Sequence, residues 1–425
     1  MSSRPVRFVH ASDLHLERPL GGVDEVPDHL TELFLESAYV AAEQVFETVL
    51  SEGAELLVLS GDVLHADRTG PRGPLFLVEQ MQRLAEREIP VYWAGGPLDP
   101  PEAWPHPIAL PANVHRFPVG RVETFQFHRD GEPVVQLSGT SVGGVSTQQP
   151  PRSTSDIFRV AVAHTSAEPA ELKTALATEG ASLPATLGPL ASEAIDYWAL
   201  GGQANRSTVL SGHPTAHFPG SPQGRTPDEV GPHGCTVVDV DATGAIRTRL
   251  CPTDTIRWLD ERIIVDEAAG RETLVAMLRE RMHTLRDTMP GLDLLVRWTI
   301  AGSGPLLARL RDGGLADSLL KRLRDDFGHG PPAAWSVGID VEPTAMLPGE
   351  WYEQETIRGD YLRALREIET NPAAMIDLAR DLPDDASLAQ LRAELPIGDQ
   401  AKRRRLLHEA ALLGVDLLTG EESES

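Results

Sequence analysis

The sequence predicts an α/β protein in which parallel strands carry polar side chains at their carboxyl ends. Residues 6–11 form a short apolar run that leads into Asp13 and His15. Residues 56–59 form a second such run, which leads into Asp62. Apolar runs of this length that end in a polar turn are typical of buried parallel strands. Because open α/β sheets place their functional groups at the carboxyl ends of strands, we expect the three side chains to lie together.

Helical patterns alternate with the strands over residues 1–252, as an α/β sandwich requires. Apolar positions predict a helix over residues 28–51 and another over about 75–88. A strand is expected at residues 89–94, and the residues from about 100 to 155 are rich in Pro, Gly and Ser, which predicts loops and short strands. Residues 237–250 are typical of a β-hairpin.

The polar residues at the strand ends suit a metal site. Two carboxylates and an imidazole, from Asp13, Asp62 and His15, are ligands for one or two divalent metal ions. A single Asp-x-His triplet is a weak signal, whereas a second aspartate on its own strand end makes the prediction much stronger.

The sequence around these strand ends resembles a known family. The stretch His-Ala-Ser-Asp-Leu-His-Leu at residues 10–16 closely resembles the opening motif of calcineurin-like metallophosphoesterases, and more narrowly that of SbcD-type DNA-repair exonuclease subunits and their YhaO-like relatives. Similar segments follow in the family's order, at residues 60–62, 159–164, 196–201 and 218–225. The resemblance runs from residue 6 to about 240 and implies a metallophosphoesterase β-sandwich flanked by helices.

The resemblance also implies a set of metal ligands. Four positions match the family's ligands, namely Asp13, His15, Asp62 and His164. Two of the family's motifs have changed in this chain. The third motif is normally Gly-Asn-His-Asp or Gly-Asn-His-Glu, and here a proline and a leucine replace the Asn and the His. The last motif is normally Gly-His-x-His, and here both histidines are missing. These departed positions are Pro97, Leu98, Gly202 and Ala204.

The changes weaken one of the family's two metal sites more than the other. In the family, the position of Asp62 bridges two ions. The first site keeps Asp13, His15 and Asp62, and an octahedral Mn²⁺ could complete its coordination with water. The second keeps only Asp62 and His164, too few ligands for tight binding. The resemblance therefore implies Mn²⁺ or another divalent ion, with at most one ion tightly bound.

Two histidines beyond the last motif, His213 and His217, are candidate substitutes for the lost ligands. They are either loop residues without a metal role, which is common for imidazoles in polar loops, or members of a rearranged site. The same residues leave two functions open. One is a metal-dependent DNA exonuclease subunit with weakened activity, because one ion and the acid histidine are missing. The other is an inactive scaffold that supports a DNA-repair ATPase.

Composition bears on partners and location. A net charge of −25 argues against a broad nucleic-acid-binding surface, although a local basic groove stays compatible with it. The basic cluster Lys402–Arg405 is either a solvated helix face or a contact with a partner or DNA. The sequence has no apolar run of eighteen residues, so we expect no membrane-spanning helix. It has only two cysteines, which is consistent with the reducing cytoplasm. A homodimer is left open.

Three domains are expected. Residues 1–252 form the nuclease-like domain, residues 253–347 a capping-like α+β domain, and residues 348–425 a helical region that ends in an acidic tail. Alternating strand and helix patterns predict the second domain. The resemblance implies that the helical region docks on an SMC-like coiled-coil ATPase subunit, as an amphipathic helix docks in a groove. The alternative is that these helices pack on their own domain.

Overall fold

The computed structural model describes most of the chain, and the residues that it describes are 5–23, 26–66, 70–143, 157–178, 183–192, 195–266, 268–302, 305–311, 313–342, 349–370 and, in part, 406–418. The chain divides into two compact units. The first comprises residues 1–260, 284–297 and 324–337, and the second comprises residues 261–283, 298–323 and 338–425.

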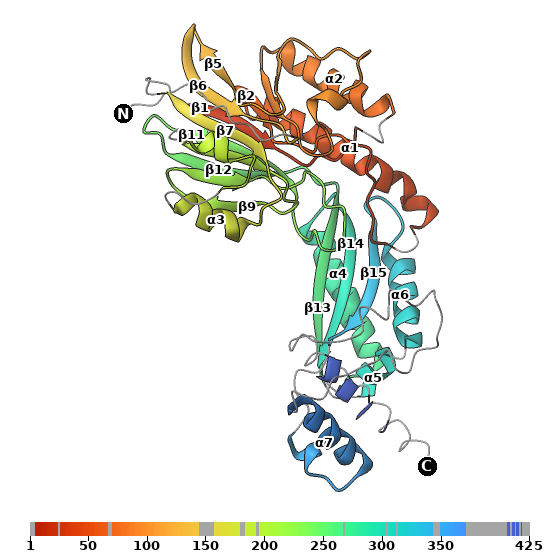
Figure 1. Cartoon of the computed structure of the whole chain (residues 1–425). Coiled ribbons are helices and arrows are strands. Elements are labelled where there is room, and N and C mark those ends of the chain that lie inside the picture. The colour runs from red at the N-terminus through yellow and green to blue at the C-terminus, as the bar shows by residue number, and fades with distance from the viewer. Residues whose placement is uncertain are drawn as a thin grey trace, which may run out of the picture. The chain divides into compact units, whose positions relative to one another are not determined.

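The first unit contains a six-stranded sheet, which includes the parallel strands predicted from the sequence (Figure 1). Its strand order is β12 (Ile246–Pro252), β11 (Gly234–Val240), β1 (Val6–Ala11), β2 (Leu56–Leu59), β3 (Val91–Ala94) and β4 (Val114–Phe117). Strands β1 to β4 are parallel, while β11 pairs antiparallel with β1 and β12. The predicted hairpin is therefore confirmed as β11 and β12, and the carboxyl ends of β1, β2 and β3 meet at one edge.

A second six-stranded sheet has the order β5 (Glu123–Arg129), β6 (Glu132–Gly139), β7 (Phe158–His164), β8 (Tyr197–Gly201), β10 (Thr215–Phe218) and β9 (Ser207–Leu210). Strands β5 and β6 form a hairpin, with a register shift between Phe127 and His128, in a region where the sequence predicted loops and short strands. Their two-residue turn is Asp130-Gly131, both with positive φ, at 54° and 78°. An Asp-Gly pair is a strong signal for this type of turn, and the Pro- and Gly-rich surroundings obscured it.

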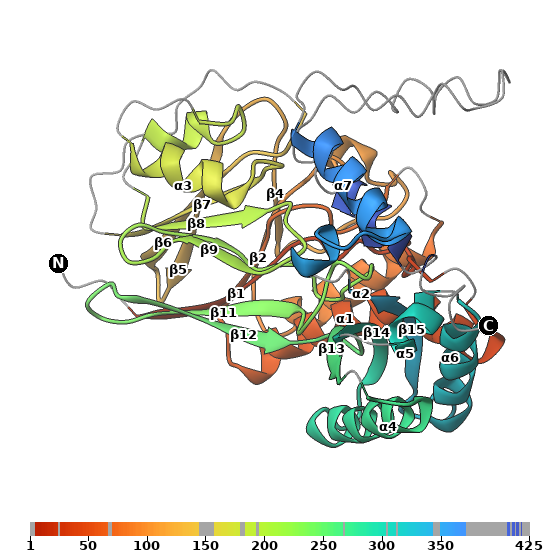
Figure 2. The ribbon, with the colours of Figure 1, turned by 90° about the horizontal axis from the view of Figure 1, so that it is seen from below.

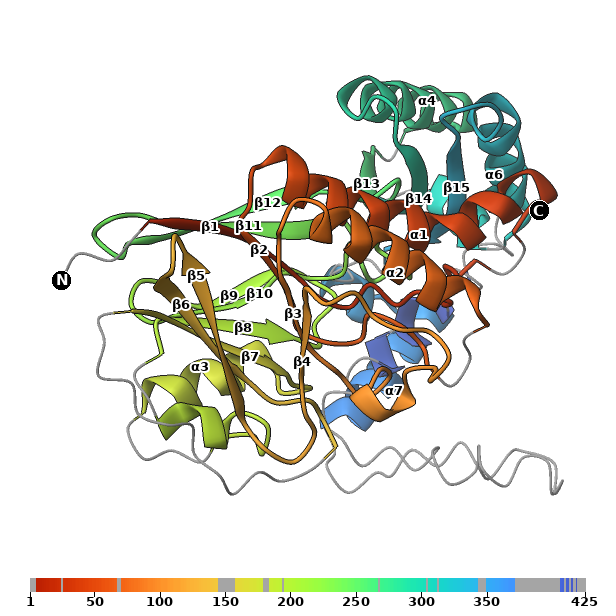
Figure 3. The ribbon, with the colours of Figure 1, turned by 90° about the horizontal axis from the view of Figure 1, so that it is seen from above.

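Three apolar cores hold the two sheets and their helices together. The core between the sheets contains Phe8 and Val58 from the first sheet and Val160 from the second. Helices α1 (Asp28–Ser51) and α2 (Arg72–Ala85), which lie side by side in Figure 3, pack on the other face of the first sheet. Helix α3 (Pro169–Ala177) covers the outer face of β7 and β8 (Figure 2). This arrangement confirms the predicted α/β sandwich flanked by helices.

The helix predictions differ in accuracy. Helix α1 has the predicted bounds, because its apolar stripe is long and regular. Helix α2 begins three residues earlier than predicted, at Arg72, and takes in Pro74. Proline is tolerated in the first turn of a helix because the N–H groups there have no intrahelical partner.

A three-stranded sheet follows, with the order β13 (Ile256–Val265), β14 (Asp293–Gly302) and β15 (Ala334–Val341). Its helices are α4 (Arg271–Thr288), α5 (Pro305–Arg311) and α6 (Gly314–Phe327). The sequence predicted one helical pattern over residues 304–327. The structure breaks it near Gly313, whose φ of +87° is the left-handed conformation in which helices commonly end.

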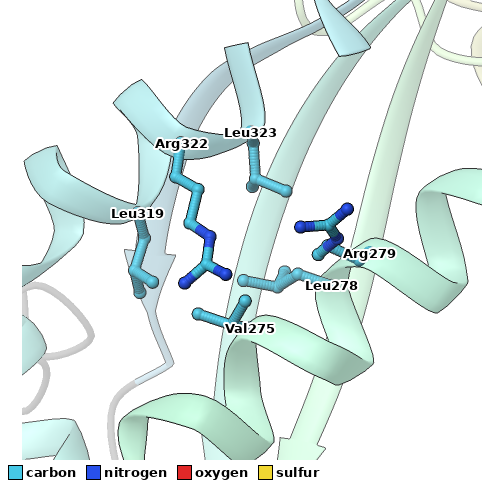
Figure 4. Close-up of a pocket in the computed structure, with 6 residues that line it drawn as sticks. All are labelled: Val275, Leu278, Arg279, Leu319, Arg322 and Leu323. Atoms are coloured by element: carbon cyan, nitrogen blue, oxygen red, sulfur yellow. The ribbon is translucent and has the colours of Figure 1, made fainter. Parts of the chain in front are cut away.

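In the second unit, α4 and α6 pack against each other through leucines. Figure 4 shows Leu278 of α4 opposite Leu319 and Leu323 of α6, with Arg279 and Arg322 beside them. The strand, helix, strand, helix order predicted for this part of the chain is present.

Near the C-terminus, α7 (Ile357–Thr370) packs with Trp351, Ala411 and Val415 around Leu362. Three short 3₁₀ helices complete the described elements, at Pro101–Ala103, Gly188–Ser192 and Gly349–Tyr352. The basic cluster Lys402–Arg405 and the acidic tail lie outside the described residues. Within the part of the chain that the structure describes, no helix is both long and apolar enough to span a membrane.

Candidate metal centre

The loops that follow β1 and β2 run side by side and carry the two predicted aspartates. The Asp13 N–H donates to the Gly61 carbonyl at 2.9 Å, and the His15 N–H donates to the Asp62 carbonyl at 3.0 Å. Asp13, His15 and Asp62 all have positive φ, at 55°, 47° and 54°. Non-glycine residues in this conformation are uncommon, and they cluster at functional sites because the surrounding structure must hold them there. The backbone therefore fixes three of the four predicted ligands in advance.

His164 comes from the second sheet, as the last residue of β7, and faces both aspartates. Its Nε2 lies 3.4 Å from Asp62 Oδ2 and 3.8 Å from Asp13 Oδ1. One ligand atom from each of the three residues lies within 4.8 Å of the others, and all three residues are buried. The structure thus brings together residues that the sequence analysis assigned to two ions bridged by Asp62. Of the residues that the structure describes, these three form the cluster that could hold an ion.

His15 lies at the edge of this cluster. Its Nε2 is 3.5 Å from Asp13 Oδ1, and its Nδ1 is within hydrogen-bond distance, 3.2 Å, of His65 Nε2. One imidazole nitrogen is thus occupied by His65, and the other faces the cluster. A ligating histidine is commonly oriented in this way through its second nitrogen. Burial, followed by the charge of His15, lowers the pKa of His65 to about 4, so His65 is neutral at pH 7.

The charges of the cluster are strongly coupled. Burial disfavours the charged form of Asp13, but its contacts with His15 and His164 outweigh burial and hold its pKa far below the usual value. Burial likewise disfavours protonated His164, yet the two carboxylates outweigh it and raise the pKa of His164 to about 10. Without a metal ion, the imidazolium of His164 therefore provides the positive charge that the two aspartates need.

The donor set fits a divalent cation. Nε2 of His164 is buried and makes no hydrogen bond of good geometry despite its proximity to two carboxylates. A buried polar atom without such a partner is expensive unless another group satisfies it. Two carboxylates and an imidazole are suitable ligands for Mn²⁺ and similar ions, and a bound cation would replace the proton on His164.

Two of the departed positions approach the cluster through their backbone. The Leu98 N–H donates to Asp62 Oδ1 at 3.1 Å, and the Gly202 N–H donates to Asp13 Oδ2 at 2.9 Å. Pro97 is exposed, and the Ala204 carbonyl accepts the Ser221 N–H at 2.9 Å. In place of the family's acid histidine at Leu98 and of a ligand histidine at Gly202, this chain has backbone donors that orient the two remaining carboxylates.

Asp99 has a structural role that the sequence did not reveal. Its buried carboxylate accepts hydrogen bonds from the backbone N–H groups of Asp62, Val63 and Gly96 and from the indole of Trp93, at 2.6–3.0 Å. Burial raises the pKa of Asp99 to about 7, although these backbone donors act against it. The signal was present, since Asp99 follows the end of a buried strand as Asp13 and Asp62 do.

The two candidate substitutes lie away from the cluster. Both ring nitrogens of His217 are taken up by hydroxyl groups, Nδ1 by Thr208 and Nε2 by Thr236, each at 2.9 Å. His213 is exposed, and its Nε2 lies 3.0 Å from Asp196 Oδ1. Neither histidine belongs to the group of described residues that could bind an ion. The local reason is that His217 lies in β10 rather than in a loop, so its ring is held between strands.

Glycines give the cluster its close packing. A Cβ added at Gly96 would lie 2.1 Å from Asp62 Oδ1 and 2.8 Å from the Asp62 backbone nitrogen. A Cβ at Gly202 would lie 2.2 Å from the Thr165 carbonyl oxygen. These are separations that real Cβ atoms do not adopt, so a larger residue would have to displace the ligand itself.

The substitution Gly96→Ala is therefore expected to displace the Asp62 carboxylate. We expect a loss of stability of about 1–3 kcal/mol from overpacking and a 10- to 100-fold weaker affinity for Mn²⁺. Denaturant titration and isothermal titration calorimetry would measure the two effects. Gly188→Ala is the matched control, because no atom lies within 4 Å of its added Cβ. Unchanged Mn²⁺ affinity in a folded Gly96→Ala protein would show that Asp62 does not bind the ion.

Comparisons with known proteins found similar proteins. The chain is 27% identical over 342 residues to the uncharacterised metallophosphoesterase YhaO of Bacillus subtilis. The matched region covers 79% of this chain and 81% of that protein. The crystal structure of TT1561 of Thermus thermophilus matches with 11% identity and a TM-score of 0.34, over 58% of this chain and 99% of that chain. No family model matches.

Proposed function

We propose that this protein is a metal-dependent phosphoesterase that cleaves phosphodiester bonds in DNA, in the manner of an SbcD- or YhaO-like exonuclease subunit with weakened activity. The observation that carries the proposal is the convergence of Asp13, Asp62 and His164, with His164 Nε2 buried between the two carboxylates and without a hydrogen bond of good geometry. The similarity to a metallophosphoesterase over four fifths of the chain supports the same chemistry.

The side chains have separate tasks in this proposal. The ion would be held by Asp13, Asp62 and His164. His15 would add a further ligand nitrogen from the edge of the cluster. A bound divalent ion supplies positive charge that stabilises a phosphoester transition state and lowers the pKa of water. The N–H groups of Leu98 and Gly202 keep the two carboxylates aimed at the ion. Asp99 fixes the loop that carries Asp62.

We expect weak rather than strong activity, with one Mn²⁺ ion tightly bound. The family's leaving-group histidine is replaced by Leu98, which offers no proton. Two-metal hydrolysis also stabilises the attacking and leaving oxygens with different ions. The loss of one ion and one general acid removes several kcal/mol of stabilisation, and each 1.36 kcal/mol corresponds to a tenfold change in rate.

The alternative is a scaffold without hydrolytic activity that supports an SMC-like coiled-coil ATPase. The observation that favours it is that the position of the family's acid histidine (Leu98) and one of its ligand positions (Gly202) offer only backbone N–H donors to the two carboxylates. In either case we propose that the C-terminal helices dock on the ATPase. Removal of residues 350–425 would then abolish co-purification with it. The net charge of −25 makes the partner the more suitable provider of a DNA-binding surface.

The deciding experiment is hydrolysis of linear duplex DNA by the purified full chain, with Mn²⁺ or with EDTA, and with closed circular DNA as the control substrate. Cleavage of linear DNA that needs Mn²⁺ supports the exonuclease. A folded protein that binds Mn²⁺ but leaves linear DNA intact, even with the ATPase added, would favour the scaffold.

A further inference from the structure

Arg225 is a buried arginine that the proposed metal centre does not yet use. It lies in the segment after β10, and its side chain is only 9% exposed. One terminal nitrogen, Nη2, lies 3.6 Å from Glu229 Oε1. The other two guanidinium nitrogens, Nε and Nη1, are buried and have no hydrogen-bond partner. Because a guanidinium stays charged in proteins, its unsatisfied donors are costly without an acceptor.

Glu229 cannot satisfy the whole guanidinium. Its Oε2 accepts the backbone N–H of Arg225 at 3.0 Å, and its Oε1 is within 3.4 Å of the Thr226 hydroxyl. The carboxylate is thus engaged in closing the turn formed by residues 225–229. It faces one edge of the arginine and leaves the Nε and Nη1 donors available to another anion.

Close contacts join the Arg225 segment to the loop that follows β1. The Gly21 N–H donates to the Arg225 carbonyl at 2.9 Å, which ties the arginine to the loop that carries Asp13 and His15. Gly22 packs so closely on Pro227 that an added Cβ would lie 2.2 Å from the proline ring. Burial lowers the pKa of Arg225, while the charges of Glu229, Asp13 and Asp62 favour its protonated form.

The chemistry of the free donors indicates their ligand. Arginine recognises phosphate through adjacent N–H groups, and the interaction is strongest where water is excluded. A guanidinium near a metal centre of two carboxylates and imidazoles would offer an anionic substrate a second point of attachment. We infer that the guanidinium of Arg225 binds a phosphoryl oxygen of the substrate next to the metal ion, an inference that rests on the proposed function.

The test measures binding of inorganic phosphate to the full chain in Mg²⁺ buffer by isothermal titration calorimetry, with Mn²⁺ affinity measured separately. Arg225→Gln is expected to weaken phosphate binding at least tenfold and to leave Mn²⁺ affinity within twofold. Arg225→Lys, which keeps the charge but not the planar donors, should lie between. In an activity arm with bis(p-nitrophenyl) phosphate, we expect Arg225→Gln to raise KM about tenfold and to change kcat less.

Two further variants separate binding from structure. Arg257→Gln is the matched control, because the Arg257 side chain is only 13% exposed but its Nε and Nη2 are paired with Asp254 at 2.7 and 2.8 Å. The phosphate affinity of this variant should equal that of the wild type. If Arg225→Gln does not fold because Glu229 is left unpaired, the double variant Arg225→Gln/Glu229→Gln removes both charges and is tested instead.

The outcomes are distinct. Wild-type phosphate affinity in the folded variant overturns the inference, and so does a loss of phosphate and Mn²⁺ binding together with a lower Tm, which would indicate a purely structural arginine. If the wild type cleaves no DNA but Arg225→Gln still loses phosphate selectively, the proposed function fails while the phosphate site stands.

Discussion

The substitution Asp62→Asn is expected to lower Mn²⁺ affinity at least about 100-fold and any Mn²⁺-dependent hydrolysis about 1000-fold, which corresponds to about 4 kcal/mol. Asp62 is the carboxylate nearest to His164, at 3.4 Å. Asparagine has the same shape but lacks the charge that attracts the ion. It also tolerates the positive φ of 54° at this position, so the backbone should keep its conformation.

The same substitution at another aspartate with the same backbone conformation provides a strict control. Asp130 in the β5–β6 turn also has a φ of 54°, but it does not belong to the group of described residues that could bind an ion. Asp130→Asn should therefore match the wild type in both measurements. Calorimetric titration with Mn²⁺ and the linear DNA assay would report the two effects. Equal metal affinity in Asp62→Asn and Asp130→Asn would refute the assignment of Asp62 as a ligand.

The substitution Asp99→Ala is expected to destabilise the fold by about 4 kcal/mol or more. It removes an acceptor from three backbone N–H groups and the Trp93 indole. Each buried donor left without a partner costs about 1–3 kcal/mol, and the deleted side chain leaves a cavity. Urea unfolding followed by tryptophan fluorescence measures the loss.

The exposed neighbour Glu102 provides the comparison for Asp99. Glu102→Ala should change stability by less than about 0.5 kcal/mol, since surface substitutions away from specific contacts rarely do more. A small effect for Asp99→Ala would mean that water replaces the carboxylate. Because Asp99 orders the loop of Asp62, we also expect Mn²⁺ affinity to fall in any Asp99→Ala protein that still folds.

Local patterns predicted those parts of the structure that local interactions determine. Helix α1 has the bounds that its apolar spacing indicated, and Asp13 and Asp62 lie at strand ends as the polar turns indicated. The grouping of His164 with both aspartates could not be predicted in this way. It depends on how the second sheet packs on the first, and strand periodicity carries no information about that packing.

The roles of Asp99 and Arg225 were hidden for a related reason. Both are charged residues in turns, which the sequence alone would place in solvent. In the structure Asp99 is 3% exposed and Arg225 7% exposed, because segments distant in the sequence close over them. The strand-end position of Asp99 was the available clue, whereas nothing local distinguished Arg225.

The hydrogen bond between Gly202 and Asp13 joins residues 189 positions apart, and it has a consequence for the order of folding. The ligands come from the ends of β1, β2 and β7, and β8 must be in place to complete their surroundings. A nascent chain that ends before residue 202 cannot assemble the whole site, and contacts of such long range form slowly. Metal ions that bind only the finished site would stabilise the native state by mass action, so the cation would act on the completed fold rather than nucleate it.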